Sequence, residues 1–316
     1  MLLIISSCED AHVKQVSQYL DAWGKTYQVL DFASLLTPHC PADTLQFNTN
    51  ADFKIALAAQ TPLDLTAITT VWYRRPSWQK LAELFSWEMD NKLASNEWRI
   101  TLNAILDSIN ARFVNQPLQQ KLATKPRQLL AAQQAGLTIP ATLITNNTLE
   151  ARRFIDKLQG RVIHKVLGTS PEQKFLATKR WSETDAGALE QLHKTPVLFQ
   201  QEITGAKDLR VTVMGDRLFA AAFDSTYAIN HEGIWIDNRL NLDVPYTEYK
   251  LPAAIQAGIL ATMQTLGLVF GTVDLKIDES GQPIFLEINP QGQFLYVEIL
   301  TGMPLAKSMA EFLTQS

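Results

Sequence analysis

The chain opens with two apolar runs that flank a helical pattern. Leu2 to Ser6 and Tyr27 to Leu30 are short apolar runs typical of buried strands. Between them, apolar residues recur at helical spacing until Gly24. A strand, a helix and a strand in this order predict a parallel sheet with covering helices. We therefore expect a first α/β domain over residues 1–115.

Two adjacent arginines follow the next strand-like run. Ala67 to Tyr73 leads directly into Arg74 and Arg75. Because ligands of open α/β sheets bind beyond the carboxyl ends of strands, these arginines could hold an anionic substrate or a developing phosphate charge. Ion pairing at a domain border explains each arginine equally well, so the pattern leaves both interpretations open.

Two lysines stand at unusual positions in the middle of the chain. Pro126 suits the first turn of a helix that Gly136 would end, which places Lys125 at the helix N-terminus. Lys165 interrupts a strand-like run directly before a polar loop. A lysine in a buried strand is costly unless an anion meets it. An outward-facing lysine is the alternative, but the sequence favours a binding role.

The run from Val197 to Ile203 changes from apolar to polar along its length. Such a strand can offer backbone N–H and C=O groups to a flat ring, with Glu202 left to accept from a sugar hydroxyl. Residues 208–214 and 218–223 then predict a hairpin joined through Gly215 and Asp216.

A second predicted hairpin, residues 271–298, gathers oxygen ligands. If Ile277 faces Ile284, Asp274 lies opposite Glu287 on the other face, with Asn289 as a diagonal neighbour. Two carboxylates and an amide oxygen suit Mg²⁺, which leaves coordination positions for phosphate oxygens. On these residues alone, a solvated face of an antiparallel sheet is an equally good interpretation.

Composition narrows the class of protein. With 316 residues, 46% of them hydrophobic and 19% charged, the chain suits a packed protein of two or three domains. The net charge of -4 and the lack of a basic run argue against a nucleic-acid partner. Cys8 and Cys40 lack metal spacing, the start is no signal peptide, and no apolar run could span a membrane. We expect a cytoplasmic protein.

Together these segments predict a nucleotide site without a P-loop. Lysines and Mg²⁺ are what a triphosphate needs, because positioning and charge neutralisation dominate phosphoryl transfer. The sequence offers no Ser-His-Asp triad and no cysteine with a spaced partner. That favours a reaction in which a substrate atom, not a side chain, attacks phosphorus.

The order of these residues resembles the ATP-grasp superfamily. The similarity is greatest to its RimK-like branch, and there to the MvdD and MdnC type ligases of graspetides (microviridin-type peptides). It covers most of the chain and is carried by Val71–Pro76 (VWYRRP), Lys125–Asn146, Asp208–Val211 (DLRV) and Phe285–Gln293 (FLEINPQGQ). The EINP-type ending with an upstream aspartate is the most specific of these motifs.

The resemblance implies an ATP-grasp fold, α/β (α+β), with an N-terminal parallel-sheet domain and two α+β subdomains at residues 116–198 and 199–316 that clasp ATP. It also implies roles. The ATP ligands would be Lys125 and Lys165 at the phosphates, Gln201, Glu202 and Ile203 along adenine and ribose, and Asp208. Two Mg²⁺ ions, or Mn²⁺, would be held by Asp274, Glu287 and Asn289, with Glu287 bridging. The catalytic cations would be Arg210, Arg239, Arg74 and Arg75.

Such enzymes make an acyl phosphate from a carboxylate and ATP, and an amine or hydroxyl then displaces phosphate. Members of the peptide branch recognise a leader segment of a precursor peptide and join its side chains as esters or amides. A ligase of amino acids or small peptides is the alternative within the mechanism. A nucleotide-binding protein without turnover is the alternative from another class. A homodimer is the family-level expectation, with neither a nucleic-acid nor a membrane partner.

Two motifs depart from the peptide branch. Its members often carry Asp-Trp-Arg, where this chain has Asp237-Asn238-Arg239. Arg239 would keep its charge role in a pocket that lacks the tryptophan. The loop after Lys165 contains a single glycine, so we expect an altered lid over ATP.

Overall fold

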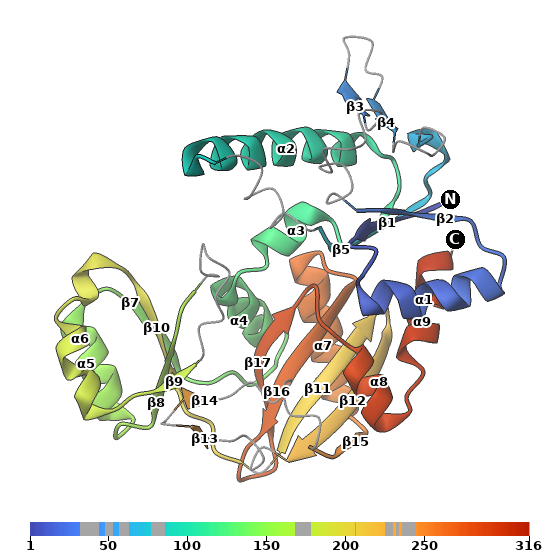
Figure 1. Ribbon diagram of the computed structural model, residues 1–316. Helices are drawn as coiled ribbons and strands as arrows, with labels where there is room; N and C mark the ends of the chain where they lie inside the picture. Colours follow the sequence, from blue (N-terminus) through green and yellow to red (C-terminus); the bar gives the residue numbers. More distant parts are fainter. Residues whose placement is uncertain are drawn as a thin grey trace. The chain divides into compact units, whose positions relative to one another are not determined.

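The chain divides into two units, and Figure 1 labels their helices and strands. This computed structural model describes residues 1–31, 44–47, 53–56, 63–76, 86–167, 178–205, 207–224, 230–231, 234–235 and 244–315. The first unit comprises Met1–Gln120, Leu268–Phe270 and Pro304–Ser316, and the second comprises Lys121–Gly267 and Gly271–Met303. The predicted boundary at residue 115 lies close to the first change of unit at Gln120. A further division at residue 198 stays a prediction.

The first unit is built on the parallel sheet that the alternating start of the chain predicts. Its strand order is β2-β1-β5-β6, and all neighbouring strands run parallel. The strands are β1 (Leu2–Ser6), β2 (Tyr27–Leu30), β5 (Thr70–Arg75) and β6 (Arg112–Val114). The other elements are α1 (Ala11–Ala22), the hairpin β3 (Thr44–Phe47) and β4 (Phe53–Ala56), the 3₁₀ helix η2 (Leu65–Ala67), α2 (Glu88–Ser108) and α3 (Pro117–Leu122).

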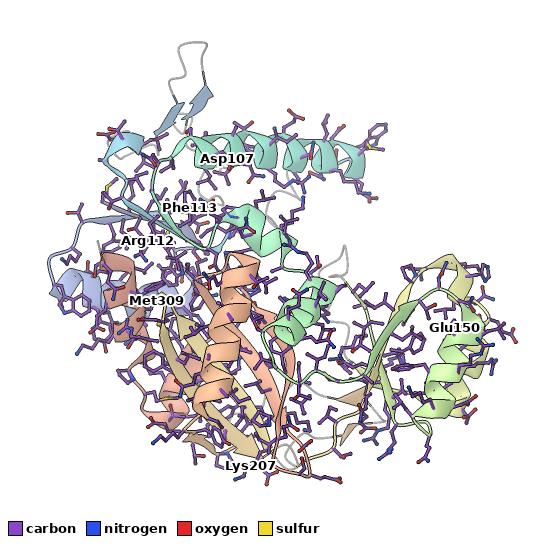
Figure 2. All side chains as sticks on the ribbon, turned by 180° about the vertical axis from the view of Figure 1, so that it is seen from behind. Asp107, Arg112, Phe113, Glu150, Lys207 and Met309 are labelled. Carbon is purple, nitrogen blue, oxygen red and sulfur yellow. The ribbon has the colours of Figure 1, made fainter. Side chains whose placement is uncertain are left out.

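The C-terminal helix α9 (Leu305–Thr314) belongs to this first unit, where it contacts α1 and β5. Arg112 on β6 donates a hydrogen bond to the carbonyl oxygen of Phe312, and its guanidinium carbon lies 4.9 Å from the centroid of that ring. Arg112 and Met309 mark these two elements in Figure 2. The last segment of the chain therefore completes the domain that the first segment begins.

The second unit begins with a sheet whose strand order is β13-β14-β9-β8-β10-β7. Its strand β10, next to the edge strand β7, pairs antiparallel with both β7 and β8. Asn147 caps α5 as predicted, because its side chain accepts from the backbone N–H groups of Leu149 and Glu150. The strands are β7 (Thr142–Thr145), β8 (Val162–Lys165), β9 (Lys179–Arg180), β10 (Val197–Gln201), β13 (Asn230–His231) and β14 (Ile234–Trp235); the helices are α4 (Lys125–Gln134), α5 (Thr148–Lys157), η4 (Glu183–Asp185), α6 (Ala186–Leu189) and η5 (Leu192–Lys194).

A five-stranded sheet of order β15-β12-β11-β16-β17 completes the second unit. Both predicted hairpins are confirmed, since β11 pairs with β12 and β16 pairs with β17, each antiparallel. Gly267 ends α7 in the left-handed region, with φ 66°. The elements are β11 (Lys207–Met214), β12 (Arg217–Asp224), β15 (Tyr246–Glu248), α7 (Ala253–Leu266), β16 (Phe270–Ile277), β17 (Pro283–Asn289) and α8 (Leu295–Thr301).

A β-bulge sets the register of the second hairpin. Asp274 lies opposite Glu287, as predicted. The predicted pairing of Ile277 with Ile284 is wrong, because Ile277 pairs with Pro283 and the register shifts between Asp274 and Leu275. The bulge accommodates one extra residue of β17. Asp274 and Glu287 therefore lie opposite each other, although the pairing near the turn is shifted by one residue from the predicted register.

Candidate active site

The five-stranded sheet has one apolar face and one polar face. A Cβ on Gly271 would lie 3.5 Å from Cε of Met263, so α7 covers the face of β16 to which Gly271 belongs. Val273 and Leu275 alternate onto that buried face, whereas Asp274 points to the other. The sheet therefore packs its apolar face on α7, and its polar face carries the candidate site residues.

Three rows of side chains cross this polar face. In the middle row, Arg210 lies opposite Ala221 on β12, and Asp274 lies opposite Glu287 on β17. The neighbouring rows follow from the same registers. One contains Phe219, Thr212, Thr272 and Asn289, and the other contains Phe223, Asp208 and Lys276.

Two ion pairs join β11 to β16 within these rows. Nη1 of Arg210 lies 2.5 and 2.7 Å from the two carboxylate oxygens of Asp274. Burial alone would lower the pKa of Arg210, but the charge of Asp274 outweighs burial and raises that pKa above its usual value. Nζ of Lys276 lies 2.8 Å from Oδ1 of Asp208. Burial raises the pKa of Asp208, and the nearby Lys276 opposes this shift.

Glu287 and Asn289 are also held by neighbours. Nζ of Lys125 lies 3.7 Å from Oε2 of Glu287, and the backbone N–H of Gln291 donates to Oδ1 of Asn289 at 3.0 Å. The turn that follows needs a glycine, because a Cβ on Gly292 would lie 1.9 Å from Oγ1 of Thr272. The Asn-Pro-Gln-Gly segment thus folds back tightly over β16.

Lys165 ends a chain of polar contacts across the other sheet. Its Nζ lies 3.3 Å from Oε1 of Gln200, whose Nε2 donates to Oγ1 of Thr142 at 3.0 Å. Burial lowers the pKa of Lys165; the charges of Glu287 and Asp274 raise it, and that of Lys125 lowers it. Lys125 also donates to the carbonyl oxygen of Val166, at 3.4 Å. Both predicted lysines therefore face the carboxylates of the hairpin.

The segment of residues 201–203, which is expected to line adenine and ribose, carries an ion pair that the sequence did not indicate. The backbone N–H groups of Gln201 and Glu202 donate to the carbonyl oxygens of Ala141 and Arg161. Nε of Arg180 lies 3.1 and 3.0 Å from the two oxygens of Glu202. Nη2 of Arg180 also lies 2.5 Å from Oε1, so the three contacts use three of the roughly four lone-pair sites of the carboxylate. Glu202 can therefore still accept a hydroxyl while paired.

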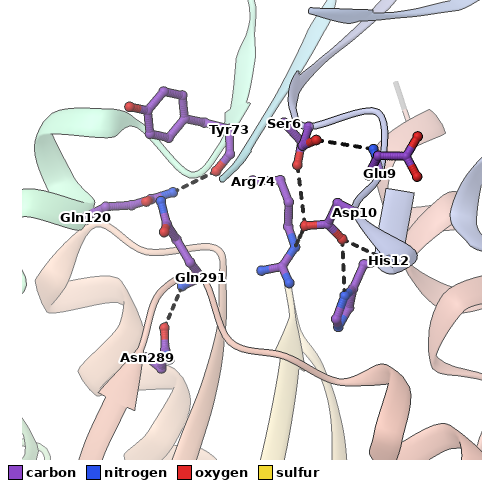
Figure 3. Close-up of polar contacts among 10 residues, drawn as sticks. Ser6, Glu9, Asp10, His12, Tyr73, Arg74, Gln120, Asn289 and Gln291 are labelled. Atoms are coloured by element: carbon purple, nitrogen blue, oxygen red, sulfur yellow. Dashed lines mark hydrogen bonds and ion pairs between the residues drawn. The ribbon is translucent and has the colours of Figure 1, made fainter. Parts of the chain in front are cut away.

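Arg74 and Arg75 have different surroundings. Figure 3 shows Arg74 beside Asp10, with Nε 3.7 Å from Oδ2, while Nδ1 of His12 lies 3.2 Å from Oδ1 of Asp10. Burial lowers the pKa of Arg74 to about 10, with the charge of Asp10 opposing that shift. Arg74 therefore forms an ion pair, and its side chain is buried, with 1% of the residue exposed. Arg75, in contrast, is exposed.

Direct catalytic roles for Arg74 and Arg75 stay predictions. The predicted catalytic Arg239 lies outside the residues that the structure describes, as does most of the loop after Lys165.

The oxygens of the polar face fit a divalent cation that comes with a nucleotide. Asp274, Glu287 and Asn289 offer hard oxygen atoms on neighbouring strands. Within the described ranges, no group of three or more His, Cys, Asp or Glu residues could hold a metal ion. Mg²⁺ often takes one or two carboxylates and completes its shell with phosphate oxygens, so two carboxylates and an amide suffice beside a triphosphate.

Comparison with protein families decides the assignment. A sequence model of the RimK-like ATP-grasp domain matches residues 120–313. The chain belongs to the RimK-like ATP-grasp family. It is an ATP-dependent ligase by this membership, and the ATP-grasp fold expected from the sequence is confirmed.

Several solved structures of peptide-modifying ATP-grasp ligases are similar to this ATP-grasp ligase over its whole length. One is the macrocyclase MdnC of Microcystis aeruginosa MRC bound with precursor peptide MdnA, with 26% identity, a TM-score of 0.85 and coverage of 100% of this chain and 99% of that one. Another is a RiPP-associated ATP-grasp ligase of Chryseobacterium gregarium in complex with ADP and a leader and core peptide, with 26% identity, a TM-score of 0.81 and coverage of 99% and 96%. The macrocyclase MdnB of Microcystis aeruginosa MRC is 27% identical, with a TM-score of 0.75 and coverage of 100% of this chain and 99% of that one.

Two further observations concern the curated relatives of the ligase and the hydropathy of its helices. No curated protein matches its sequence. Among the helices of the described ranges, none has both the length and the hydropathy needed to cross a membrane.

Sequence reasoning missed three partners of the site residues: Gln200, Lys276 and Arg180. Gln200 is the first polar residue of β10 after three apolar ones and lies directly opposite Thr142, so a polar residue within the strand was the available signal. Lys276 follows Asp274 at the two-residue spacing that places both on one face of β16, which could have revealed it. Nothing local marks Arg180, because its partner Glu202 is distant in the sequence and directly follows β10.

Proposed function

We propose that this ligase uses ATP to join side chains within a ribosomally made precursor peptide. The observation that carries the proposal is the row formed by Arg210, Asp274 and Glu287, with Lys125 beside Glu287. This row lies in a chain that matches MdnC, crystallised with its precursor peptide, over almost the full length of both proteins.

Lys125 and Lys165 would contact the phosphates of ATP. Both side chains belong to the electrostatic surroundings of the hairpin carboxylates, and Gln200 holds the half-buried Lys165 in one direction. Adenine would lie along Gln201, Glu202 and Ile203. The backbone N–H groups of Gln201 and Glu202 already donate within the protein. Of the three residues, Ile203 is therefore best suited to donate to the base. Glu202 would accept from the ribose, and Asp208 would complete the nucleotide pocket.

Asp274, Glu287 and Asn289 would bind Mg²⁺, two ions with Glu287 bridging, or Mn²⁺ in their place. Bound there, the cation would neutralise charge on the phosphates during transfer. Arg210 and Lys125, which hold these carboxylates in the structure, would turn toward substrate oxygens as the carboxylates take up the cation.

The reaction would have two steps. A carboxylate oxygen of an Asp or Glu side chain attacks the γ-phosphorus, the bond to the bridging oxygen breaks, and ADP leaves. A hydroxyl or amine then attacks the carbonyl carbon of the acyl phosphate, loses its proton, and phosphate leaves, which gives an ester or an amide. Arg210 would stabilise the charge that develops in both steps, and Arg239, Arg74 and Arg75 would add further positive charge. Preorganised cations of this kind contribute a large part of the electrostatic stabilisation of a transition state.

The partner would be a precursor peptide with a leader segment. A homodimer and a cytoplasmic location accompany the proposal as predictions from the resemblance.

Loss of the carboxylate charge at Glu287 tests the proposed site. Glu287→Gln keeps the shape of the side chain, so the protein should fold while ADP formation with ATP, Mg²⁺ and peptide falls to background. Glu279→Gln changes the same chemical group in the exposed turn of the same hairpin and should leave turnover unchanged. Normal turnover by Glu287→Gln would show that the metal assignment is wrong.

A further inference from the structure

One edge of the guanidinium group of Arg210 has no hydrogen-bond partner in the part of the chain that the structure describes. Asp274 takes Nη1, whereas Nε and Nη2 are buried and have no hydrogen-bond partner among the described residues. Nε and Nη2 form the edge that donates two parallel hydrogen bonds to a carboxylate or a phosphate. The residue is 2% exposed, so water from bulk solvent does not satisfy this edge.

Two threonine hydroxyls next to Arg210 share this property. Oγ1 of Thr212 and Oγ1 of Thr272 are buried and, in the described part of the chain, have no hydrogen-bond partner. Both residues are 0% exposed. Buried polar groups in folded proteins are nearly always hydrogen-bonded, so three such side chains together indicate a partner that the described residues do not supply.

The sheet places these groups side by side. Arg210 pairs with Asp274 and Asp208 pairs with Lys276, so β11 and β16 run in opposite directions, with Thr212 next to Thr272 in the following row. Residues two apart on a strand share a face, so both hydroxyls lie on the face of the guanidinium. On the other side of Arg210, β12 brings only the methyl group of Ala221.

Aromatic rings border the same face. Tyr246 on β15 lies opposite Phe223, with their rings stacked at 4.6 Å between centroids. Tyr296 of α8 meets Tyr246 edge to face at 5.7 Å. Rings at this border lower the local dielectric constant, which strengthens the attraction between an anion and Arg210.

We propose that Thr212 and Thr272, together with the free edge of Arg210, form an oxyanion subsite. The edge would donate two hydrogen bonds to a pair of oxygens, and the hydroxyls would donate to the same group or to its third oxygen. The ligand is a carboxylate or a phosphoryl group. That the occupant is the acid side chain, or the phosphate that leaves it, rests on the proposed function; the existence of the subsite does not.

Thermal unfolding in the presence of small anions tests the subsite without turnover. The probes are orthophosphate and N-acetylglutamate N-methylamide, whose only ionised group is the side-chain carboxylate. The proteins are the wild type, Thr212→Val, Thr272→Val and the double variant. Valine keeps the volume and removes only the hydroxyl. Thr262→Val is the matched control, because Thr262 is equally buried but donates to the carbonyl oxygen of Gly258 within α7.

At constant ionic strength, at least one probe should raise the Tm of the wild type and of Thr262→Val more than that of the double variant. Each lost hydroxyl should weaken anion binding about fivefold, the usual effect of one hydrogen bond. Without anion, the Tm of the threonine variants should not fall, because valine replaces a buried hydroxyl that has no hydrogen-bond partner among the described residues. The single variants provide the same comparison if the double variant does not fold.

The pattern of responses identifies the source of the oxyanion. A differential response to the capped glutamate alone assigns the subsite to the acid substrate, and one to orthophosphate alone assigns it to the phosphoryl group. Because phosphate also stabilises folded proteins nonspecifically, only a difference in Tm shift between the variants indicates binding at the subsite. Equal shifts in all variants, or no shift in the wild type, would overturn the proposal. Loss of turnover in Glu287→Gln addresses the proposed function separately.

Discussion

Nη1 of Arg210 contacts both carboxylate oxygens of Asp274, at 2.5 and 2.7 Å, so a predicted metal ligand is held by a protein cation. Around it, Arg210, Lys125 and Lys165 carry three positive charges against the two negative charges of Asp274 and Glu287. Such a site repels a free divalent cation and attracts a nucleotide that carries one.

Arg210→Met should therefore tighten the binding of free Mn²⁺ about tenfold or more in the absence of nucleotide, because it removes a positive charge next to Asp274. Electron paramagnetic resonance of free Mn²⁺ measures this affinity. Arg153→Met removes the same charge from the surface of α5 and should change nothing. Equal affinities in all three proteins would mean that Arg210 does not compete with the metal.

Gln200→Leu should weaken ATP binding about fivefold to tenfold. The change removes the oxygen that holds Lys165 and the amide that donates to Thr142, so the ammonium group loses its fixed direction. Titration with a fluorescent ATP analogue measures the Kd. Gln133→Leu, an exposed change on α4, is the control. Unchanged affinity in Gln200→Leu would exclude a positioning role for this side chain.

The affinity for ATP should fall on the alkaline side at a lower pH than an ordinary lysine would cause. Burial lowers the pKa of Lys165 from its usual 10.5, so the free protein loses this charge before an exposed lysine does. In Lys165→Arg the charge persists, and the alkaline decline should move to higher pH. The Kd for ATP between neutral pH and pH 10.5 checks this, with Lys157→Arg on α5 as control. An unchanged profile in Lys165→Arg would assign the decline to another group.

Stability should depend on Asp10 at acid pH. Burial alone would raise the pKa of Asp10, but the hydrogen bond from His12 and the charge of Arg74 hold that pKa below its usual value. A lowered pKa in the folded state contributes stability above about pH 4, and this contribution is lost as the pH falls toward the folded-state pKa.

Asp10→Asn should lower the free energy of unfolding at pH 7 by about 3–5 kcal/mol, because it removes the carboxylate charge that faces the buried guanidinium group of Arg74. It should also flatten the acid dependence. Denaturant unfolding at pH 7 and at lower pH measures both effects, with Glu9→Gln on the exposed neighbour as control. An equally steep acid decline in Asp10→Asn would show that other carboxyl groups cause it.

The sequence predicted those parts of the site that depend on local pattern. The hairpin carboxylates meet because alternation within a strand determines the face, and the bulge in β17 left their pairing intact. The cap at Asn147 and the position of Lys125 at the start of α4 are equally local. The parallel N-terminal sheet followed from the order of its elements.

Contacts between distant segments could not be predicted in this way. Alternation does not show whether Arg74 turns into the unit toward Asp10, and local pattern does not pair Arg180 with Glu202. The return of α9 to the first unit depends on tertiary packing against α1. The buried Nε and Nη2 of Arg210 and the hydroxyls of Thr212 and Thr272 have no hydrogen-bond partner among the described residues, and only the folded sheet shows this.

The most direct test of the account is the reaction itself. The protein is incubated with ATP, Mg²⁺ and a precursor peptide encoded beside it, and the nucleotide and the peptide mass are measured together. The account predicts ADP, and a peptide lighter by one water for each crosslink, with neither product from Glu287→Gln. AMP and pyrophosphate in place of ADP, or ADP formed at the peptide-dependent rate while the peptide keeps its mass, would contradict it.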